Sequence, residues 1–181
     1  MASTTVLPNG DGTLTAWQDQ VGGASNLYTR VDELVASPTD ADYIISTLTT
    51  NSMFFLLQDM PSDLGTVTDA VVKARVNRDS GSRTLTAQLF QSDESTALTN
   101  SQTTAALGGT ITNYTLTHTI TGATTKTAWD GARLKLTGSG TNINVYATQV
   151  DITYTVAADM PGSLVDGGLV KSKLVTGRPV V

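Results

Sequence analysis

The sequence GTVTDAVVKARVNR (residues 65–78), followed by DSGS (79–82) and RTLTAQLFQ (83–91), decides the fold class. The first segment alternates apolar and polar residues with one slip, and the last alternates without a slip. A period of two places the apolar side chains on one face of a β-strand. The polar segment between them, which contains Gly81, is typical of a hairpin turn. The stretch therefore predicts two antiparallel strands, each with one buried face.

The rest of the chain repeats this pattern of a short strand followed by a polar turn. Of the 181 residues, 32 are threonine and only two are glutamate, a composition that favours strands over helices. Seven or eight strands at this spacing, without alternating helices, predict an all-β fold. We expect a two-sheet antiparallel sandwich of the jelly-roll type. Helical periodicity occurs only over residues 27–35, where a single short helix is expected.

The last long strand, residues 143–156, carries a change of phase. Ile143 and Val145 share one phase, whereas Val150, Ile152, Tyr154 and Val156 share the other. A β-bulge near Tyr146 would reconcile the two phases. We therefore expect the second group to face the core, with Asp151 and Thr153 on the outer face.

Three regions follow from this reading. Residues 1–16, with a turn signal at 8–12, are expected to form an N-terminal arm. Residues 17–156 form the β-sandwich domain, with a long loop at 92–111. Residues 157–181 are interrupted by glycine and proline and are expected to form an extended C-terminal arm.

The C-terminal arm is the predicted partner-binding segment. It carries apolar and β-branched residues that could add to an exposed sheet edge, and basic residues suited to an acidic neighbour. The residues concerned are Leu169, Val170, Lys171, Lys173, Leu174, Val175 and Arg178.

Charge and cysteine content exclude several function classes. The net charge is −5 and the eleven Lys and Arg residues are scattered, which argues against a nucleic-acid or membrane-surface partner. The chain has no cysteine, so no disulfide or thiolate metal site is expected. The first residues lack the basic and apolar regions of a signal peptide.

No residue constellation indicates catalysis or a cofactor. His118 is the single histidine, and it lies within a predicted strand on the same face as Leu116 and Ile120. A packed strand residue is therefore the expected role. Most aspartates lie beside Gly, Ser or Pro, where they stabilise turns. Residues 9–12 resemble half of a calcium loop but lack the remaining ligands. We expect a non-enzymatic protein without metal or cofactor.

Several aromatic and apolar anchors together resemble a known family. They are Trp17, residues 27–33, residues 40–44, residues 71–76, Trp129 and residues 150–154. Their order resembles that of the small jelly-roll structural proteins of tailed-bacteriophage virions. The resemblance implies a capsid cement or decoration protein that assembles in the host cytoplasm, forms homo-oligomers and binds other virion proteins such as the major capsid protein. A neck, tail or fibre subunit is the related alternative.

Two other classes remain open at the level of sequence. A carbohydrate-binding module would also be a sandwich, and would need two or three aromatic side chains exposed on one face or loop cluster. The exposed aromatics would come from Trp17, Trp129, Tyr28, Tyr43, Tyr114, Tyr146 and Tyr154. A small jelly-roll hydrolase would need a buried pair of carboxylates about 5 to 9 Å apart.

Overall fold

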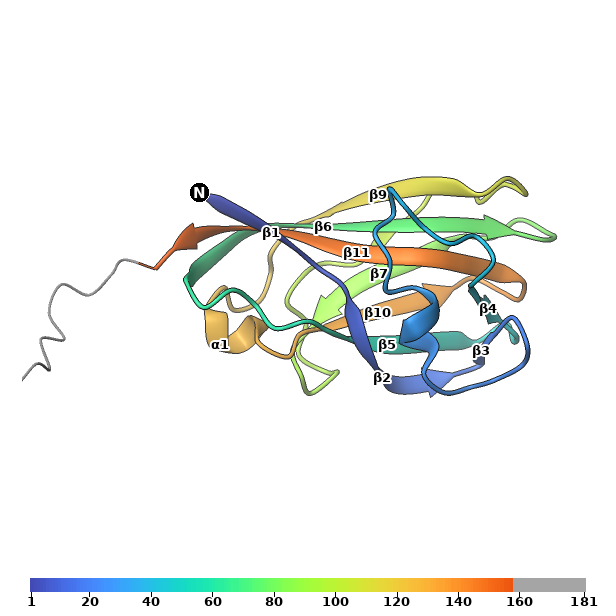
Figure 1. Ribbon diagram of the computed structural model, residues 1–181, viewed down its shortest axis with the longest axis horizontal. Helices are drawn as coiled ribbons and strands as arrows, with labels where there is room; N and C mark the ends of the chain where they lie inside the picture. The colour runs from blue at the N-terminus through green and yellow to red at the C-terminus, as the bar shows by residue number, and fades with distance from the viewer. Residues whose placement is uncertain (158–181) are drawn as a thin grey trace, which may run out of the picture.

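Two antiparallel sheets packed face to face make up the part of the chain that the computed structural model describes, residues 1–157 (Figure 1). Sheet A has the order β3-β4-β11-β6-β9, and β1 also pairs with β11. Its strands are β1 (Ala2–Val6), β3 (Trp17–Asp19), β4 (Ile44–Ser46), β6 (Leu64–Arg78), β9 (Thr112–His118) and β11 (Ile143–Val156). Sheet B has the order β2-β5-β10-β7-β8. Its strands are β2 (Pro8–Thr15), β5 (Asn51–Leu57), β7 (Leu85–Phe90), β8 (Gln102–Thr103) and β10 (Arg133–Gly138). The predicted two-sheet antiparallel sandwich is confirmed.

The turn at residues 79–82 does not make a hairpin, and this part of the prediction was wrong. β6 pairs with β11 and β9 in sheet A, whereas β7 pairs with β10 and β8 in sheet B. The turn therefore carries the chain from one sheet to the other. Each strand has one apolar face. That face is buried equally well whether the two strands pair within one sheet or face each other across the core.

The long pair of β11 with β6 contains the irregularities that the sequence predicts. The register shifts between Val145 and Ala147, which confirms the expected bulge near Tyr146. A second shift between Thr153 and Tyr154 accounts for the slip in β6, because Asp69 and Val67 are their successive partners. These two bulges thus keep most of the apolar residues of both strands on the inner face, and a third shift lies at the end of β11, between Thr155 and Val156.

The core lies between the sheets and is built from the inward residues of nearly every strand. Its largest fully buried side chains include Trp17, Phe55 and Trp129. In β11, Val150, Ile152 and Tyr154 are buried as expected, while Asp151 and Thr153 are partly exposed. Val156 departs from its expected phase, since it is 53% exposed at the end of the strand.

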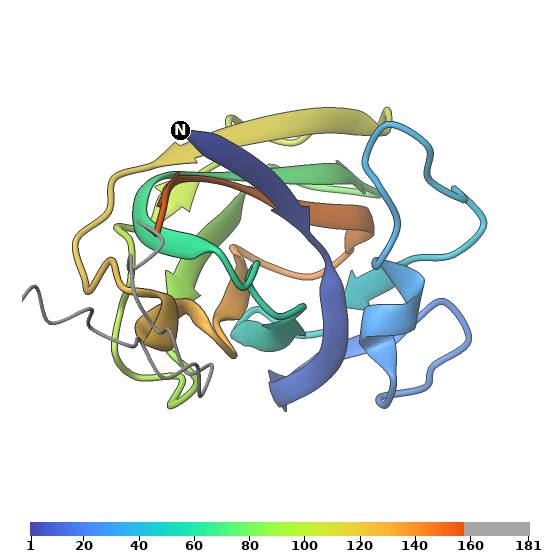
Figure 2. The same ribbon diagram turned by 60° about the vertical axis from the view of Figure 1, so that its left-hand side comes forward.

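Residues 2–15, expected as an arm, form β1 and β2 and belong to the sandwich. β1 pairs with β11 from Ala2 opposite Tyr154 to Val6 opposite Val150, and β2 pairs with β5. Figure 2 shows this segment passing from one layer to the other. Val6 is 2% exposed, so the segment contributes to the core as well as to hydrogen bonding.

Helical structure is limited to two short turns. The helix expected over residues 27–35 is the 3-10 turn η1 (Leu27–Arg30), and α1 (Lys126–Trp129) was not predicted. The Asp11 carboxylate accepts hydrogen bonds of 2.8 Å from the backbone N–H groups of Leu27 and Tyr28 and so stabilises the start of η1. The expected loop at 92–111 contains the short β8.

The predicted C-terminal arm lies outside the described residues. This applies to all seven residues predicted to bind a partner: Leu169, Val170, Lys171, Lys173, Leu174, Val175 and Arg178.

Candidate functional site

Residues 32–43, here called the cover loop, run from η1 to β4 over the outer face of sheet A (Figures 1 and 2). Just before it, the Val31 carbonyl accepts a 2.9 Å hydrogen bond from the Thr148 N–H. Within it, the Val35 N–H donates to Gln149 Oε1 at 3.0 Å. The cover loop is thus fixed to β11, the central strand of the sheet.

An ion pair fastens the far part of the cover loop to β6. Arg75 donates two parallel hydrogen bonds to the Asp40 carboxylate, at 2.7 and 2.6 Å. These bonds hold the pKa of Asp40 below its usual value and raise the pKa of Arg75. A third N–H of Arg75 donates to Asn113 Oδ1 at 3.1 Å, so the same guanidinium also fixes a side chain on β9.

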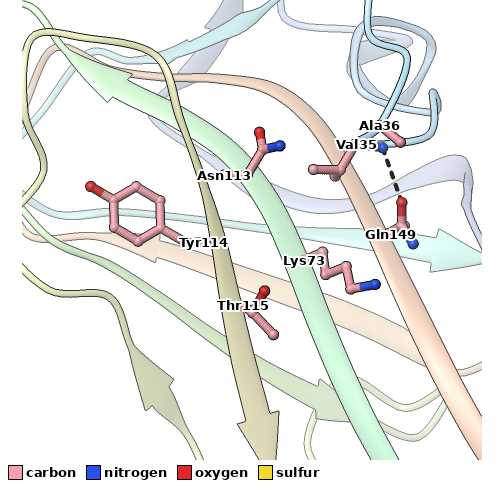
Figure 3. Close-up of a pocket in the computed structure, with 7 residues that line it drawn as sticks. All are labelled: Val35, Ala36, Lys73, Asn113, Tyr114, Thr115 and Gln149. Atoms are coloured by element: carbon pink, nitrogen blue, oxygen red, sulfur yellow. Dashed lines mark hydrogen bonds between the residues drawn. The ribbon is translucent and has the colours of Figure 1, made fainter.

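A pocket of about 250 Å³ lies between the cover loop and β9 (Figure 3). Its lining residues are Val35, Ala36, Lys73, Asn113, Tyr114, Thr115 and Gln149. The Lys73 and Asn113 side chains face the space beside Val35, whereas the Tyr114 ring points to the other side of β9. The pocket therefore joins a polar floor, built on three strands, to an aliphatic wall supplied by the loop.

Lys73 on the pocket floor is paired with Asp151 on the neighbouring strand. Lys73 Nζ lies 2.7 Å from Asp151 Oδ2, and the other carboxylate oxygen accepts from Thr5 at 2.7 Å and from Gln149 at 2.8 Å. Burial acts to raise the pKa of Asp151, but these hydrogen bonds outweigh it and hold that pKa below its usual value. The Asp151 carboxylate is therefore ionised at neutral pH, and its charge offsets that of Lys73.

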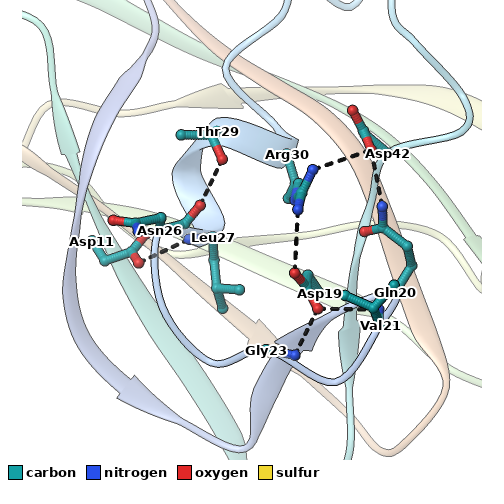
Figure 4. A network of polar contacts seen from close by, with 10 residues as sticks. All are labelled: Asp11, Asp19, Gln20, Val21, Gly23, Asn26, Leu27, Thr29, Arg30 and Asp42. Atoms are coloured by element: carbon teal, nitrogen blue, oxygen red, sulfur yellow. Dashed lines mark hydrogen bonds and ion pairs between the residues drawn. The ribbon is translucent and has the colours of Figure 1, made fainter.

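A second polar network fixes both ends of the cover loop (Figure 4). Arg30 lies between Asp19 and Asp42, at 3.4 Å from each carboxylate. Asp19 is 6% exposed, and its pKa is lowered by the hydrogen bond from the Gly23 N–H and by that from the Val21 N–H. Both Asp19 oxygens have local donors, because Oδ1 accepts from the Val21 and Gly23 N–H groups and Oδ2 from Arg30, so we assign the network a structural role.

One aromatic pair lies on the same face as the pocket. The rings of Tyr43 and Tyr146 are 5.2 Å apart and tilted by 44°. Tyr146 is 6% exposed, and burial raises its pKa, while its hydroxyl donates to Asn77 Oδ1 at 3.3 Å. Tyr43 is half-buried and is the member of the pair that a ligand could touch. Both tryptophans lie in the core, so they cannot form a binding platform.

The structure places His118 where the strand pattern predicts it, on the inner face of β9. The side chain is 3% exposed, and its Nδ1 lies 2.9 Å from the Asn100 carbonyl oxygen. No carboxylate contacts its ring within residues 1–157, so the described part of the chain contains no Ser-His-Asp arrangement.

The described residues contain neither a cluster of metal ligands nor a helix that could span a membrane. Across residues 1–157, no three His, Cys, Asp or Glu side chains gather as metal ligands would. Residues 9–12, similar to half of a calcium loop, lie in β2, and Asp11 among them caps η1. Within the same range, neither helical turn approaches the length or apolar character needed to cross a membrane.

Of the residues that line the pocket, only Tyr114 was singled out by sequence reasoning, as a candidate exposed aromatic. Lys73, Asn113 and Gln149 are single outward-facing residues of β6, β9 and β11, and polar residues occupy such positions throughout the sandwich. Only the fold brings them together under the cover loop. No local motif could have identified them.

Comparison with known proteins gives similarity at the level of structure. No family model matches the sequence, and no curated protein is similar to it. The C-terminal CBM6 of LamC, a marine laminarinase from Zobellia galactanivorans, has 11% identity and a TM-score of 0.46, over 84% of this chain and 99% of that one. The carbohydrate-binding module CBM6cm-2 from Cellvibrio mixtus lichenase 5A, in complex with cellotriose, has 10% identity and a TM-score of 0.45, over 84% and 97%. The CBM35 from Paenibacillus barcinonensis has 19% identity and a TM-score of 0.44, over 85% and 99%.

The expected resemblance to bacteriophage virion proteins is wrong. The solved structures compared above are carbohydrate-binding modules, and no virion protein is among them. Trp17 and Trp129, two of the anchors that carried the resemblance, are core residues at 2% and 0% exposure. Large apolar anchors recur in unrelated sandwiches because every such core must be filled. The capsid cement role is therefore withdrawn.

Proposed function

We propose that this chain is a non-catalytic carbohydrate-binding module and that the pocket under the cover loop binds the sugar. The observation that carries the proposal is the pocket itself, in which polar side chains from β6, β9 and β11 face an aliphatic wall. A pyranose offers hydroxyl groups and an apolar C–H surface, and so can use both sides of such a site. Its volume lies just below the roughly 300–1,000 Å³ of small-ligand sites, which suits a single sugar residue.

Contacts within the chain hold the pocket in shape. Gln149 and Asp40 fasten the cover loop, while Arg75 orients Asn113. A site whose side chains are already positioned loses less conformational entropy on binding. This pre-organisation supports a binding role for the pocket.

The carboxylates near the pocket support binding over catalysis. A glycoside hydrolase needs one carboxylic acid whose pKa is raised so that it can donate a proton. Asp40 and Asp151 have lowered pKa values because each is held in an ion pair. Neither carboxylate is therefore suited to act as a general acid near neutral pH.

A glycan array with three proteins tests the proposal. The wild type is compared with Thr115→Trp, which fills the pocket, and with Thr117→Trp. Thr117 is a matched control because it is also exposed on the outer face of β9, two residues from Thr115, and does not line the pocket. We expect saccharide binding by the wild type and Thr117→Trp, and its loss in Thr115→Trp.

Two results would contradict the proposal. If the wild type binds no saccharide, the proposed function is wrong. Equal binding by all three proteins would leave a sugar-binding module but place its site elsewhere. Circular dichroism of each variant establishes that the sandwich is folded before its binding is compared.

A further inference from the structure

The side-chain groups that face the pocket are mostly hydrogen-bond donors. Asn113 Oδ1 accepts from Arg75, and because a guanidinium can only donate, this contact fixes the amide orientation. Both N–H groups of Asn113 Nδ2 are then left without a partner among the described residues. Lys73 Nζ makes one contact, to Asp151, out of the three that an ammonium group can donate.

Apart from the Thr115 hydroxyl, the side-chain acceptors described here around the pocket are already used. Gln149 Oε1 accepts from the Val35 N–H. The Asp40 carboxylate accepts from Arg75. The Asp151 carboxylate accepts from Lys73, Thr5 and Gln149. Thr115 Oγ1 is the lining hydroxyl that has no partner within residues 1–157. A ligand that completes these contacts must therefore supply a strong acceptor.

The charge balance favours a neutral acceptor over a carboxylate. Lys73 is paired with Asp151 and Arg75 with Asp40, so the charges of these two pairs sum to zero. A carboxylate ligand would have to compete with Asp151 for Lys73, and it would be desolvated without an unpaired cation beside it. A carbonyl oxygen accepts from the same donors without that cost.

The aliphatic wall requires an apolar group next to that acceptor. Val35 is 5% exposed, and it lies beside Ala36 on the cover loop, facing Asn113 across the pocket. A methyl group on this wall would be removed from water, which favours its binding. The ligand thus needs a carbonyl oxygen and a methyl group attached to the same carbon.

We propose that the pocket recognises the acetamido group of an N-acetylated amino sugar, an inference that rests on the proposed carbohydrate-binding function. The acetamido carbonyl accepts from Asn113 and Lys73, its methyl group contacts Val35 and Ala36, and its N–H donates to Thr115. A 2-hydroxyl group provides neither the strong acceptor nor the methyl group. A 2-ammonium group repels Lys73.

Titration calorimetry with matched sugars tests this proposal. The ligands are the methyl β-glycosides of the gluco and galacto series carrying a 2-acetamido, 2-ammonium or 2-hydroxyl group, together with the corresponding uronates. We expect the acetamido sugar of at least one series to bind about tenfold or more tightly than its 2-hydroxyl counterpart, the factor that corresponds to about 1.4 kcal/mol.

The Asn113→Asp variant tests the residue assignment. It keeps the oxygen that accepts from Arg75 and removes both N–H groups. The expected result is loss of most of the preference for the acetamido sugar, while Thr117→Val keeps it. Retention of the full preference in Asn113→Asp would overturn the assignment.

The outcomes separate this inference from the proposed function. If 2-hydroxyl sugars or uronates bind as tightly as acetamido sugars, the inference is wrong while carbohydrate binding stands. If none of the sugars binds and the glycan array is also empty, both fail. A preference that survives Thr115→Trp would place the acetamido site outside the pocket and overturn the inference.

Discussion

His118 illustrates how a buried residue can make stability depend on pH. Burial lowers its pKa, although the hydrogen bond to Asn100 and the charge of Asp69 act in the opposite direction. The unfolded chain has a histidine pKa of about 6.5 and therefore binds this proton at a higher pH than the folded chain does. The contribution to the free energy of unfolding is thus full above a pH of about 6.5. It is lost as the pH falls from there towards the lower folded-state pKa.

Urea unfolding of the wild type and of His118→Gln at about pH 7.5 and about pH 5 measures this contribution. We expect the wild type to lose more stability between the two pH values than the variant does. The carboxylates titrate in both proteins, so their effect largely cancels in the difference. The same pH dependence in both proteins would show that His118 contributes nothing to it.

The Arg75–Asp40 ion pair is one of the contacts that hold the cover loop to sheet A. Asp40→Asn removes the charge from the bidentate contact with Arg75. Because the Asp40 side chain is 41% exposed, we expect a global cost of about 1 kcal/mol or less. Hydrogen exchange should nevertheless become faster in residues 32–43, while β5 and β10 are unchanged.

A matched control for this loop is Asp130→Asn. This variant removes the ion pair between Asp130 and Lys126 at α1, whose side chains are about as exposed as those of the Arg75–Asp40 pair. Hydrogen exchange of the cover loop should stay as in the wild type. Faster exchange of the loop in both variants would mean that the loop responds to global stability and not to the Arg75 contact.

The phase of β11 is tested by two adjacent substitutions. Ile152 is fully buried, so Ile152→Ala should lower the free energy of unfolding by about 2–5 kcal/mol. Thr153 is partly exposed on the outer face, and Thr153→Ala should change stability by about 0.5 kcal/mol or less. Chemical denaturation measures both values, and similar losses would contradict the assigned faces.

Strands could be predicted from the sequence because each has one apolar face that must be buried. The bulges followed from the same rule, since a change of phase within β11 leaves no other way to keep Val145 and Val150 both inside. Strand partners could not be predicted, because the turn at residues 79–82 serves either a hairpin or a crossing between sheets. The alternation alone does not distinguish these.

The N-terminal segment shows a different difficulty. Pro8, Gly10 and Gly12 indicate a turn, yet they lie within β2. A Cβ atom on Gly12 would lie 2.9 Å from the Cβ of Phe54, so this glycine permits close approach to β5 instead of making a turn. The pocket was beyond prediction for a related reason, because it depends on which strands become neighbours and on the Arg75–Asp40 contact.

At the scale of the whole molecule, the two ends of the chain should differ in their effect on folding. Deleting residues 2–15 removes β1 and β2, and with them Val6 from the core. We expect this protein not to give a cooperative unfolding transition. Deleting Met160–Val181 should leave the unfolding transition within about 1 kcal/mol of the full chain, because every residue of the described core cluster lies between Val6 and Tyr154.

The C-terminal deletion also tests the predicted homo-oligomer. If the basic and apolar segment around Lys171 and Leu174 joins copies of the chain, sedimentation should show association of the full chain and a monomer for the truncated one. Equal behaviour of the two proteins would mean that this segment does not mediate association. Added salt should weaken an association that depends on its basic residues.

The position of β11 in the chain has a consequence for synthesis on the ribosome. β11 follows β1, β4 and β6 in the sequence, yet it is the strand to which all three are hydrogen-bonded. Until residues 143–156 have been translated, each of these strands has an edge without its native partner. Sheet A can therefore be completed only after β11 has been translated. Pairings between distant parts of a chain also form slowly, and unpaired edges invite aggregation. The growing chain should depend on chaperones more than its size alone would indicate.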